Sequence, residues 1–351
     1  MRLTLLRSAV TTTFSTAIPK GVRMFSFHGD PASMAAKRRL LLLLKPFNAY
    51  PLHNSHGFSK ITNPKILRHF DDRIQVHKDA VKYCQDILRR KMVDCETLFY
   101  NELSRPIKDV DLVITIGGDG TLLQASHFMD DTIPVLGVNS DPTQIEEVEQ
   151  FKDEFDATRS AGYLCAATTK NFERVLDGIL DERTVASEIS RISIKLNSQL
   201  LPTHALNDVL IAHPCPASLS RFSFRNDGQP DGSLINCRSS GLRVSTAAGS
   251  TAAMLSAGGF AMHILSKDLQ YMVREPMQPT PANLSSMHGL LKSNQTMEIH
   301  WSTKEGAIYI DGCQIAQPIK LGDFIALSTQ ASVLKIFLPP NVLPVKGPAK
   351  L

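Results

Sequence analysis

The sequence has few cysteines and no long apolar run. Its six cysteines are scattered over 351 residues without any Cys-x-x-Cys pair, a distribution that argues against both a zinc site and a disulfide framework. We therefore expect all six to be reduced thiols. No uninterrupted apolar run approaches the roughly 18 residues of a membrane-spanning helix, so we expect no membrane contact.

Two common nucleotide-binding motifs are also missing, and acidic residues are scarce at the start. The sequence contains neither Gly-x-x-x-x-Gly-Lys-Ser/Thr nor Gly-x-Gly-x-x-Gly, which excludes a P-loop and a redox Rossmann fingerprint. Residues 1–45 carry eight Lys and Arg against the single acid Asp30, a net charge of +7, whereas the whole chain has +4. The remainder therefore carries −3, which does not support a basic nucleic-acid surface.

Both ends of the chain have features of targeting segments. Residues 1–36 are basic, poor in acids and rich in Ser and Thr, so we expect a flexible or targeting extension, either a transit peptide or a disordered leader. The last three residues, Ala349-Lys350-Leu351, are a close variant of the peroxisomal Ser-Lys-Leu signal. These features predict a peroxisomal or cytoplasmic location, with a mitochondrial location as the alternative.

The first half of the chain alternates between strand and helix patterns. Five consecutive leucines, 40–44, end at Lys45-Pro46 and predict a central strand of a parallel sheet. Further elements are predicted as a helix over 71–90, a strand over 111–116, a helix from Thr121, a strand over 133–139 and a helix over 171–182. This order is typical of an open doubly wound sheet, whose ligands lie beyond the carboxyl ends of the strands.

Beyond residue 186 the period changes to that of short strands. Ile192, Ile194 and Leu196 alternate with polar residues, the pattern of a strand with one buried face. Short strands continue over 205–212, 222–224, 242–246, 297–301 and 308–310. Since the length also favours two domains, we predict an α/β domain over 37–186, a β-rich domain over 187–325, and a return segment with a tail over 326–351.

The chain is organised around the loop between the strand 111–116 and the next helix. Gly117, Gly118 and Gly120 are predicted to give positive φ and close approach of a ligand to the main chain. Free N–H groups and the helix that opens at Thr121 would bind phosphate. Asp119 beside bound phosphates would need a role, such as a general base or a metal ligand. The alternative is an ordinary turn with Asp119 as the helix N-cap.

Three further groups of residues are candidates for binding. Asn139 ends a predicted strand on the same sheet edge as the glycine loop. Asn207-Asp208 is a polar pair within an apolar strand, which costs free energy unless it is satisfied. Residues 246–256 are small or carry hydroxyls before Met254, so they could line a flat ligand or pack a helix against a sheet.

These motifs, in this order, resemble the NAD kinase family, and most closely the plant NADH kinases. The resemblance rests on Gly117–Thr121, Asn207-Asp208, Gly249–Ala252 and Asp311-Gly312, and it spans residues 37–340. It implies ATP-dependent phosphorylation of the adenosine ribose 2′-hydroxyl of NADH or NAD, with Mg²⁺ bridging ATP oxygens and no metal ligand assigned to the protein. It also implies a homodimer, in which a neighbouring subunit completes the pocket.

The resemblance also implies roles for single residues. Asp119 would be the general base, Asn207 and Asp208 would hold the dinucleotide, and Thr251, Ala252 and Ser256 would line the same pocket. Ser240 and Ala253 stand where the family often has Asp and Tyr, and from these changes we expect better acceptance of NADH than of cationic NAD. Two rival functions remain, a diacylglycerol-type lipid kinase and a non-catalytic NADH sensor.

Overall fold

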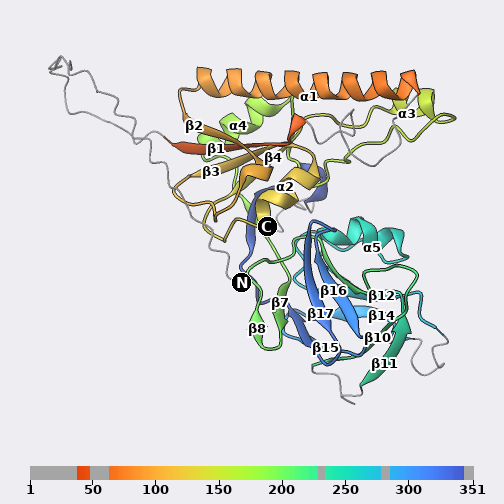
Figure 1. Cartoon of the computed structure of the whole chain (residues 1–351). Coiled ribbons are helices and arrows are strands. Elements are labelled where there is room, and N and C mark those ends of the chain that lie inside the picture. The colour runs from red at the N-terminus through yellow and green to blue at the C-terminus, as the bar shows by residue number, and fades with distance from the viewer. Residues whose placement is uncertain (1–37, 48–62, 228–233, 278–284, 344–351) are drawn as a thin grey trace, which may run out of the picture. The chain divides into compact units, whose positions relative to one another are not determined.

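The structure is a computed structural model that describes residues 38–47, 63–227, 234–277 and 285–343. The predicted extension over 1–36 and the Ala349-Lys350-Leu351 tail lie outside the described residues. Residues 38–351 form one compact unit, which contains three sheets (Figure 1).

The first sheet is mainly parallel and has helices on both faces. Its strands are β1 (Arg39–Leu44), β2 (Asp94–Phe99), β3 (Leu112–Gly117), β4 (Val135–Asn139), β5 (Ala167–Thr168), β6 (Ser187–Ile189) and β19 (Leu334–Phe337). Their order is β2-β1-β3-β4-β19-β6, and β5 pairs with β4. The sheet confirms the predicted α/β fold of the first half.

The leucine strand β1 shows how the two faces are built. Leu40, Leu42 and Leu44 pack with residues of α1 and α4, whereas Leu41 and Leu43 pack with residues of α2. Successive strand residues point to opposite faces, so a run of leucines can fill both layers. The helices are α1 (Pro64–Arg90), α2 (Asp119–Ser126), α3 (Ile145–Phe151), α4 (Phe172–Leu180) and α5 (Ala253–Ser256), with 3-10 turns at Tyr100–Glu102, Gly249–Thr251 and Pro340–Val342.

Two helices begin earlier than the sequence pattern predicted. Helix α1 starts at Pro64 rather than at residue 71, because the Asn63 side chain caps it by accepting a hydrogen bond from the Lys65 N–H at 2.9 Å. Its apolar stripe is weak in this first part, so periodicity did not reveal the extra turns. Helix α2 starts at Asp119 rather than at Thr121, and Gly118 is its N-cap.

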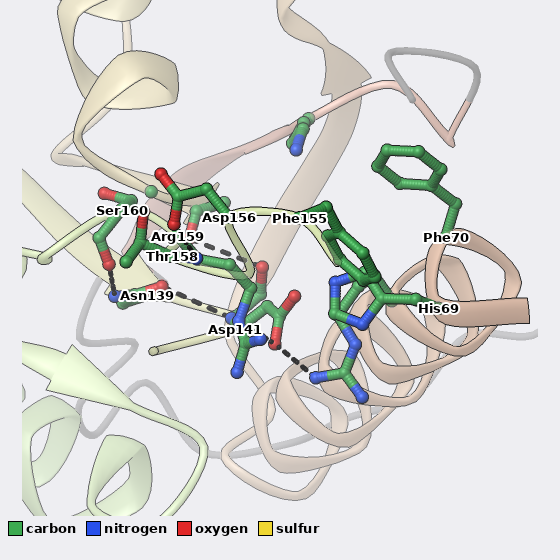
Figure 2. A pocket seen from close by; sticks show the side chains of 14 residues that line it. His69, Phe70, Asn139, Asp141, Phe155, Asp156, Thr158, Arg159 and Ser160 are labelled. Carbon is green, nitrogen blue, oxygen red and sulfur yellow. Dashed lines mark hydrogen bonds and ion pairs between the residues drawn. The ribbon is translucent and has the colours of Figure 1, made fainter. Parts of the chain in front are cut away.

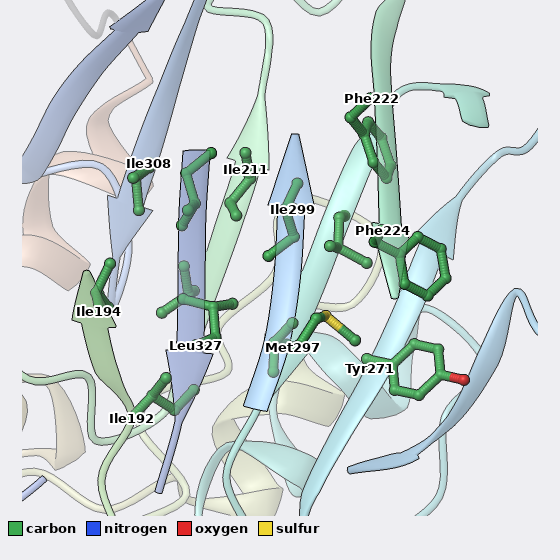
Figure 3. Close-up of a cluster of buried hydrophobic side chains, with 14 of the residues drawn as sticks. Ile192, Ile194, Ile211, Phe222, Phe224, Tyr271, Met297, Ile299, Ile308 and Leu327 are labelled. Carbon is green, nitrogen blue, oxygen red and sulfur yellow. The ribbon is translucent and has the colours of Figure 1, made fainter. Parts of the chain in front are cut away.

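The β-rich character predicted for the second half is confirmed, and the structure shows how it is built, as a sandwich of two antiparallel sheets. One sheet has the order β11-β10-β15-β18-β7-β8 and the other β14-β13-β12-β9-β16-β17. The strands are β7 (Ser193–Leu196), β8 (Gln199–Leu200), β9 (Asp208–Ala212), β10 (Ser220–Asn226), β11 (Ile235–Ser239), β12 (Gly241–Ser245), β13 (Leu269–Arg274), β14 (His288–Leu291), β15 (Thr296–Trp301), β16 (Glu305–Ile310), β17 (Ile315–Lys320) and β18 (Phe324–Ser328). Both sheets contribute side chains to one apolar core, among them Phe224 and Ile211 (Figure 3).

The chain crosses between the two halves at positions that differ from the predicted ones. Strand β6 pairs with β19 in the first sheet, although residues 187–189 were assigned to the β-rich domain. Strand β18 runs past residue 325 in the second sheet, so the return begins after Ser328. Strand β19 then enters the first sheet between β4 and β6.

Arg191 departs from the pattern that predicted a solvent-facing polar side chain. It is 1% exposed, and burial lowers its pKa to about 10. Its guanidinium donates hydrogen bonds to the carbonyls of Ser126, Met129, Ser332 and Val333 and to the Ser332 hydroxyl. A cation at carbonyls that follow a helix is favourable, so Arg191 ties the end of α2 to the returning chain.

Candidate active site

The glycine loop is held by close packing rather than by unusual backbone angles. None of Gly117, Gly118 and Gly120 has positive φ, so that expectation was wrong; Gly118 is extended, with φ −127° and ψ −166°. A Cβ on Gly117 would lie 2.1 Å from Thr121 Oγ1, and one on Gly118 would lie 2.5 Å from Ser160 Cβ. A Cβ on Gly120 would meet no atom within 4 Å. The main chain is therefore open to a ligand at Gly120.

Asp119 is anchored by a segment that follows it in the chain by about forty residues. One carboxylate oxygen accepts from the Leu164 N–H at 2.9 Å and from the Cys165 thiol at 3.5 Å. The other accepts from the Tyr163 N–H at 2.9 Å and from the Ser160 hydroxyl at 3.4 Å. The reading of Asp119 as the N-cap was wrong, because Gly118 has that position and Asp119 is the first helical residue.

These contacts occupy the roughly four acceptor positions of a carboxylate. The Ser160 contact is the longest of the oxygen and nitrogen contacts, and Ser160 Oγ also accepts from the Asp119 N–H at 3.0 Å. A substrate hydroxyl could reach Asp119 by replacing this weak partner. Burial, and then Asp119 itself, raise the pKa of the neighbouring Cys165 well above its usual value, so this thiol is not a competing nucleophile.

The carboxyl end of β4 adds polar residues beside the loop. The Asn139 amide donates to the Ser160 carbonyl at 3.2 Å, and its oxygen accepts from the Asp141 N–H at 3.3 Å. Ser140 contacts the buried imidazole of His77 at 2.8 Å, and the other ring nitrogen of His77 contacts the Lys45 carbonyl at 3.0 Å. Since a carbonyl can only accept, this second nitrogen, Nε2, carries the hydrogen.

Three cavities lie along the glycine loop and the β-rich half, and the second of them shares lining residues with each of the other two. The first, about 230 Å³, is lined by Gly117, Gly118 and Asn139 and by residues of α1 and of 155–160. The second, about 460 Å³, is lined by Gly118, Gly120 and Thr121 and by residues 311–314. The third, about 640 Å³, lies at Asp208, Arg243 and Tyr309. The first and second share Lys45, Gly118 and Ser160, and the second and third share Gly312 and Cys313.

Asp311 joins the β-rich half to the helix of the glycine loop. Its carboxylate accepts from the main-chain N–H groups of Leu206, Asn207 and Asp208 at 2.7–3.0 Å. It also contacts His127 Nε2 at the end of α2 at 2.9 Å, and both side chains are buried. Asp311 was noticed in the sequence only as part of a motif, and its role as an anchor depends on contacts between residues far apart in the chain.

Asn207 and Asp208 stand where β9 begins. The Asn207 carbonyl accepts from the Thr246 N–H at 2.9 Å, and it leaves no room for a Cβ on Gly249, which would lie 2.1 Å away. The Asp208 carboxylate forms an ion pair with Arg243 in the 640 Å³ cavity. The main chain of Asn207 and the side chain of Asp208 therefore have partners within the chain, and Asp208 also lines a cavity.

Thr251, Ala252 and Ser256 lie apart from these cavities. Ala252 and Ser256 are exposed, and Thr251 is half-buried, with its hydroxyl donating to the Ala248 carbonyl at 3.3 Å. Their neighbours Leu255 and Phe260 are each 46% exposed. None of the three predicted residues lines the cavities described above.

A cluster of charged residues near Asn139 was not found from the sequence. Arg73 of α1 contacts Asp141 at 3.1 Å and Glu147 at 3.2 Å, and Arg159 pairs with the same two carboxylates. Burial is the largest influence on Asp141 and raises its pKa, although Arg159 and Arg73 oppose the shift. No local spacing marks these four residues, because they come from three separate segments.

Two features are absent from the described residues. No helix among them is long and apolar enough to cross a membrane. Within those same ranges, no three His, Cys, Asp or Glu side chains converge in an arrangement that could hold a metal ion.

Two plant proteins are similar to this chain over nearly their whole length. The family model of the ATP-NAD kinase N-terminal domain matches residues 62–141. The NADH kinase of Arabidopsis thaliana is 56% identical over 315 residues, which cover 89% of this chain and 99% of that protein. A protein of Oryza sativa subsp. japonica named "Probable NADH kinase" is 53% identical over 321 residues, covering 88% of this chain and 98% of that protein.

Solved structures of the same fold are more distant in sequence. The yeast NADH kinase complexed with NADH has a TM-score of 0.62 and 17% identity, covering 87% of this chain and 84% of that chain. An NAD kinase from Archaeoglobus fulgidus in complex with ATP has a TM-score of 0.59 and 18% identity, covering 87% and 95%. The chain thus shares its fold, an α/β sheet joined to a β sandwich, with these two kinases. The chain belongs to the NAD kinase family.

Proposed function

We propose that this chain transfers the terminal phosphoryl group of ATP to the 2′-hydroxyl of the adenosine ribose of NADH, and also of NAD. The proposal rests mainly on one observation. The sequence of this chain is 53–56% identical to two plant proteins named as NADH kinases, over 98–99% of their length. The glycine loop supports it, because the main chain at Gly120 is open beside a cavity of about 460 Å³. The comparisons lend no support to a lipid kinase or to a non-catalytic sensor.

In this reaction the residues of the chain mainly position the substrates. Phosphoryl transfer depends on alignment and charge neutralisation more than on covalent help. We propose that the ATP phosphates lie at the main chain of Gly118 and Gly120, and Mg²⁺ bound together with ATP would neutralise part of their charge. Asp119 takes the proton of the 2′-hydroxyl as general base, while Asn207 and Asp208 hold the dinucleotide. Thr251, Ala252 and Ser256 are proposed to complete its pocket.

The test uses the purified full-length chain with ATP, Mg²⁺ and NADH. We expect NADPH and ADP to form in equal amounts, as resolved by chromatography. A reaction without ATP is the control. Binding of NADH without formation of NADPH would favour the sensor, and transfer of phosphate to diacylglycerol in vesicles, but not to NADH, would favour the lipid kinase.

We also propose that NADH is a better acceptor than NAD. Ser240 lines the 640 Å³ cavity together with Arg243 and Arg274, whose carboxylate partners are Asp208 and Glu275. Two guanidinium groups near Ser240 repel the cationic nicotinamide ring of NAD, and the neutral Ser240 side chain supplies no negative charge that would offset this repulsion. The nicotinamide ring of NADH is uncharged and is not repelled. Parallel measurements of kcat/KM on both substrates test this preference, and a strong preference for NAD would contradict it.

A homodimer is the proposed assembly. Leu255 and Phe260 are each 46% exposed and Leu265 is 37% exposed. These apolar side chains are close in sequence to Thr251 and Ser256, which are proposed to line the dinucleotide pocket. A partner subunit over this surface would bury these apolar side chains and enclose the pocket. Light scattering measures the mass of the active species, and an active monomer would refute the proposal.

The proposed location is the peroxisome or the cytoplasm, with the mitochondrion as the alternative. It rests on Ala349-Lys350-Leu351 and on the basic residues 1–36. Fluorescent protein is fused to the N-terminus in one version and to the C-terminus in another, so that one end of the chain is free in each. The N-terminal fusion is also made without the last three residues, and microscopy then distinguishes the three compartments.

A further inference from the structure

The cavity of about 230 Å³ at the sheet edge has one aromatic side and one polar side (Figure 2). His69 and Phe70 of α1 and Phe155 line the aromatic side, and Asn139, Thr158 and Ser160 line the polar side. A cavity smaller than the ~300–1,000 Å³ of sites for a complete ligand suits one part of a larger molecule.

The aromatic side consists of rings that pack against one another. The rings of His69 and Phe155 have centroids 5.0 Å apart, and Phe155 stacks at 4.8 Å on Phe151, which does not line the cavity. Burial, and then the charge of Arg73, lower the pKa of His69, so its ring is neutral near pH 7. Flat neutral rings offer a stacking surface for a planar base.

The arginines of this cavity serve its own framework. Arg73 and Arg159 each contact both Asp141 and Glu147, so two positive charges face two negative charges. Their side chains are only 13% and 10% exposed. A phosphate here would compete with two carboxylates already in place. The pairing instead joins α1 to residues 141–160 and so holds the aromatic side against the sheet edge.

We propose that this cavity binds the purine base of the phosphoryl donor. The proposal deepens the proposed function and rests on it. The donor phosphates then extend past Lys45, Gly118 and Ser160, which line both this cavity and the 460 Å³ cavity at Gly120. The base lies against Phe155, and the Asp156 carboxylate at the cavity wall accepts a hydrogen bond from its exocyclic amino group.

Three variants of the full-length chain test this assignment. Phe155→Leu removes the stacking ring, and Thr158→Trp fills the cavity from an exposed position, so its folding is not at risk. Phe151→Leu is the matched control, because it removes a ring of the same aromatic cluster from outside the cavity. We expect the first two to raise the KM for ATP about 5- to 100-fold, the range for loss of base stacking, with the KM for NADH unchanged. Phe151→Leu keeps both values.

Inorganic tripolyphosphate separates the base from the phosphates. It has no base, so its inhibition constant against ATP is expected to be the same in the parent chain, in Phe155→Leu and in Thr158→Trp. The assignment is overturned if tripolyphosphate weakens along with ATP, if the KM for NADH rises instead, or if the KM for ATP stays unchanged in Thr158→Trp. Absence of NADPH formation in the parent chain would instead refute the proposed function.

Discussion

The carboxylate of Asp119 is both an anchor and the proposed base, and Asp119→Asn separates the two roles. The two main-chain N–H groups of Tyr163 and Leu164 each donate to a different carboxylate oxygen at 2.9 Å. An asparagine has only one oxygen, so one of these donors would face an NH₂ group. Leaving a partly buried donor unsatisfied costs about 1–3 kcal/mol. The melting temperature should fall by a few degrees, since 1 kcal/mol is worth about 2–4 °C in a chain of 150–250 residues and less in a longer chain such as this one.

The effect on rate should be much larger than this loss of stability. General-base contributions are ~10²–10⁴-fold, so we expect kcat of Asp119→Asn to fall at least about a hundredfold. The assay follows NADPH at a temperature well below the melting transition of the variant. The KM for NADH and for ATP should be retained, because the amide still accepts a hydrogen bond and removes a negative charge near the phosphates.

Asp323→Asn is the matched control for Asp119→Asn. Asp323 is buried between β17 and β18, and its two oxygens accept from Asn197 Nδ2 at 2.9 Å and from the Lys320 N–H at 2.8 Å. The same chemical change should therefore cost similar stability without an effect on kcat. If Asp119→Asn loses stability but keeps kcat within a few-fold of the parent chain, Asp119 is an anchor of residues 160–165 and not the base.

Three further predictions concern the loop, a buried histidine and the exposed thiols. Gly120→Ala adds a Cβ in open space, so we expect its melting temperature to stay close to that of the parent chain while kcat/KM for ATP falls. In Gly118→Ala the added Cβ meets Ser160, so we expect this variant to be less stable. Equal kinetics in Gly120→Ala and the parent chain would contradict the phosphate site. Burial lowers the pKa of His77 from its usual value, so its stabilising contribution is present above about pH 6.5 and is lost as the pH falls below that value. Denaturant titrations measure the free energy of unfolding at pH 7.5 and at pH 5.5. We expect the difference between the two values to be smaller for His77→Gln than for the parent chain. Cys215 and Cys313 are exposed thiols, and since Cys313 lines two cavities, iodoacetamide should inactivate the parent chain but not Cys313→Ser, and NADH should slow the inactivation.

Periodicity predicted the elements that are governed by local sequence. Leu40–Leu44 form a strand buried on both faces, and the alternation at Ile192 and Ile194 marks a strand of the sandwich core. The glycine loop was also placed correctly at a strand end, because three glycines around a carboxylate are a local signal. Its backbone angles were predicted wrongly, since the glycines avoid Thr121 and Ser160, and such neighbours cannot be read from a spacing.

The parts of the site that sequence reasoning missed depend on contacts between distant segments. Arg191 is buried because carbonyls at the end of α2 and near Ser332 surround it, and carbonyl acceptors leave no mark in a sequence. The same holds for Asp311, which orders the start of β9 through main-chain N–H groups. The N-cap of α2 was also missed, because Gly118 has no side chain that could form a capping hydrogen bond and so mark the start of the helix in the sequence.

The position of β19 has a consequence for how the chain is made. Val135 of β4 pairs with Ile336 of β19, 201 positions later. During synthesis at ~5–20 residues per second, β4 would wait about 10–40 s after its own emergence from the ribosome before this partner is complete. Throughout that interval the start of β4, at Val135 and Leu136, presents unpaired main-chain groups on one edge, because β5 pairs only with Val138 and Asn139. Such groups are a template for pairing with other chains. The second half must therefore be translated before the first sheet can be completed.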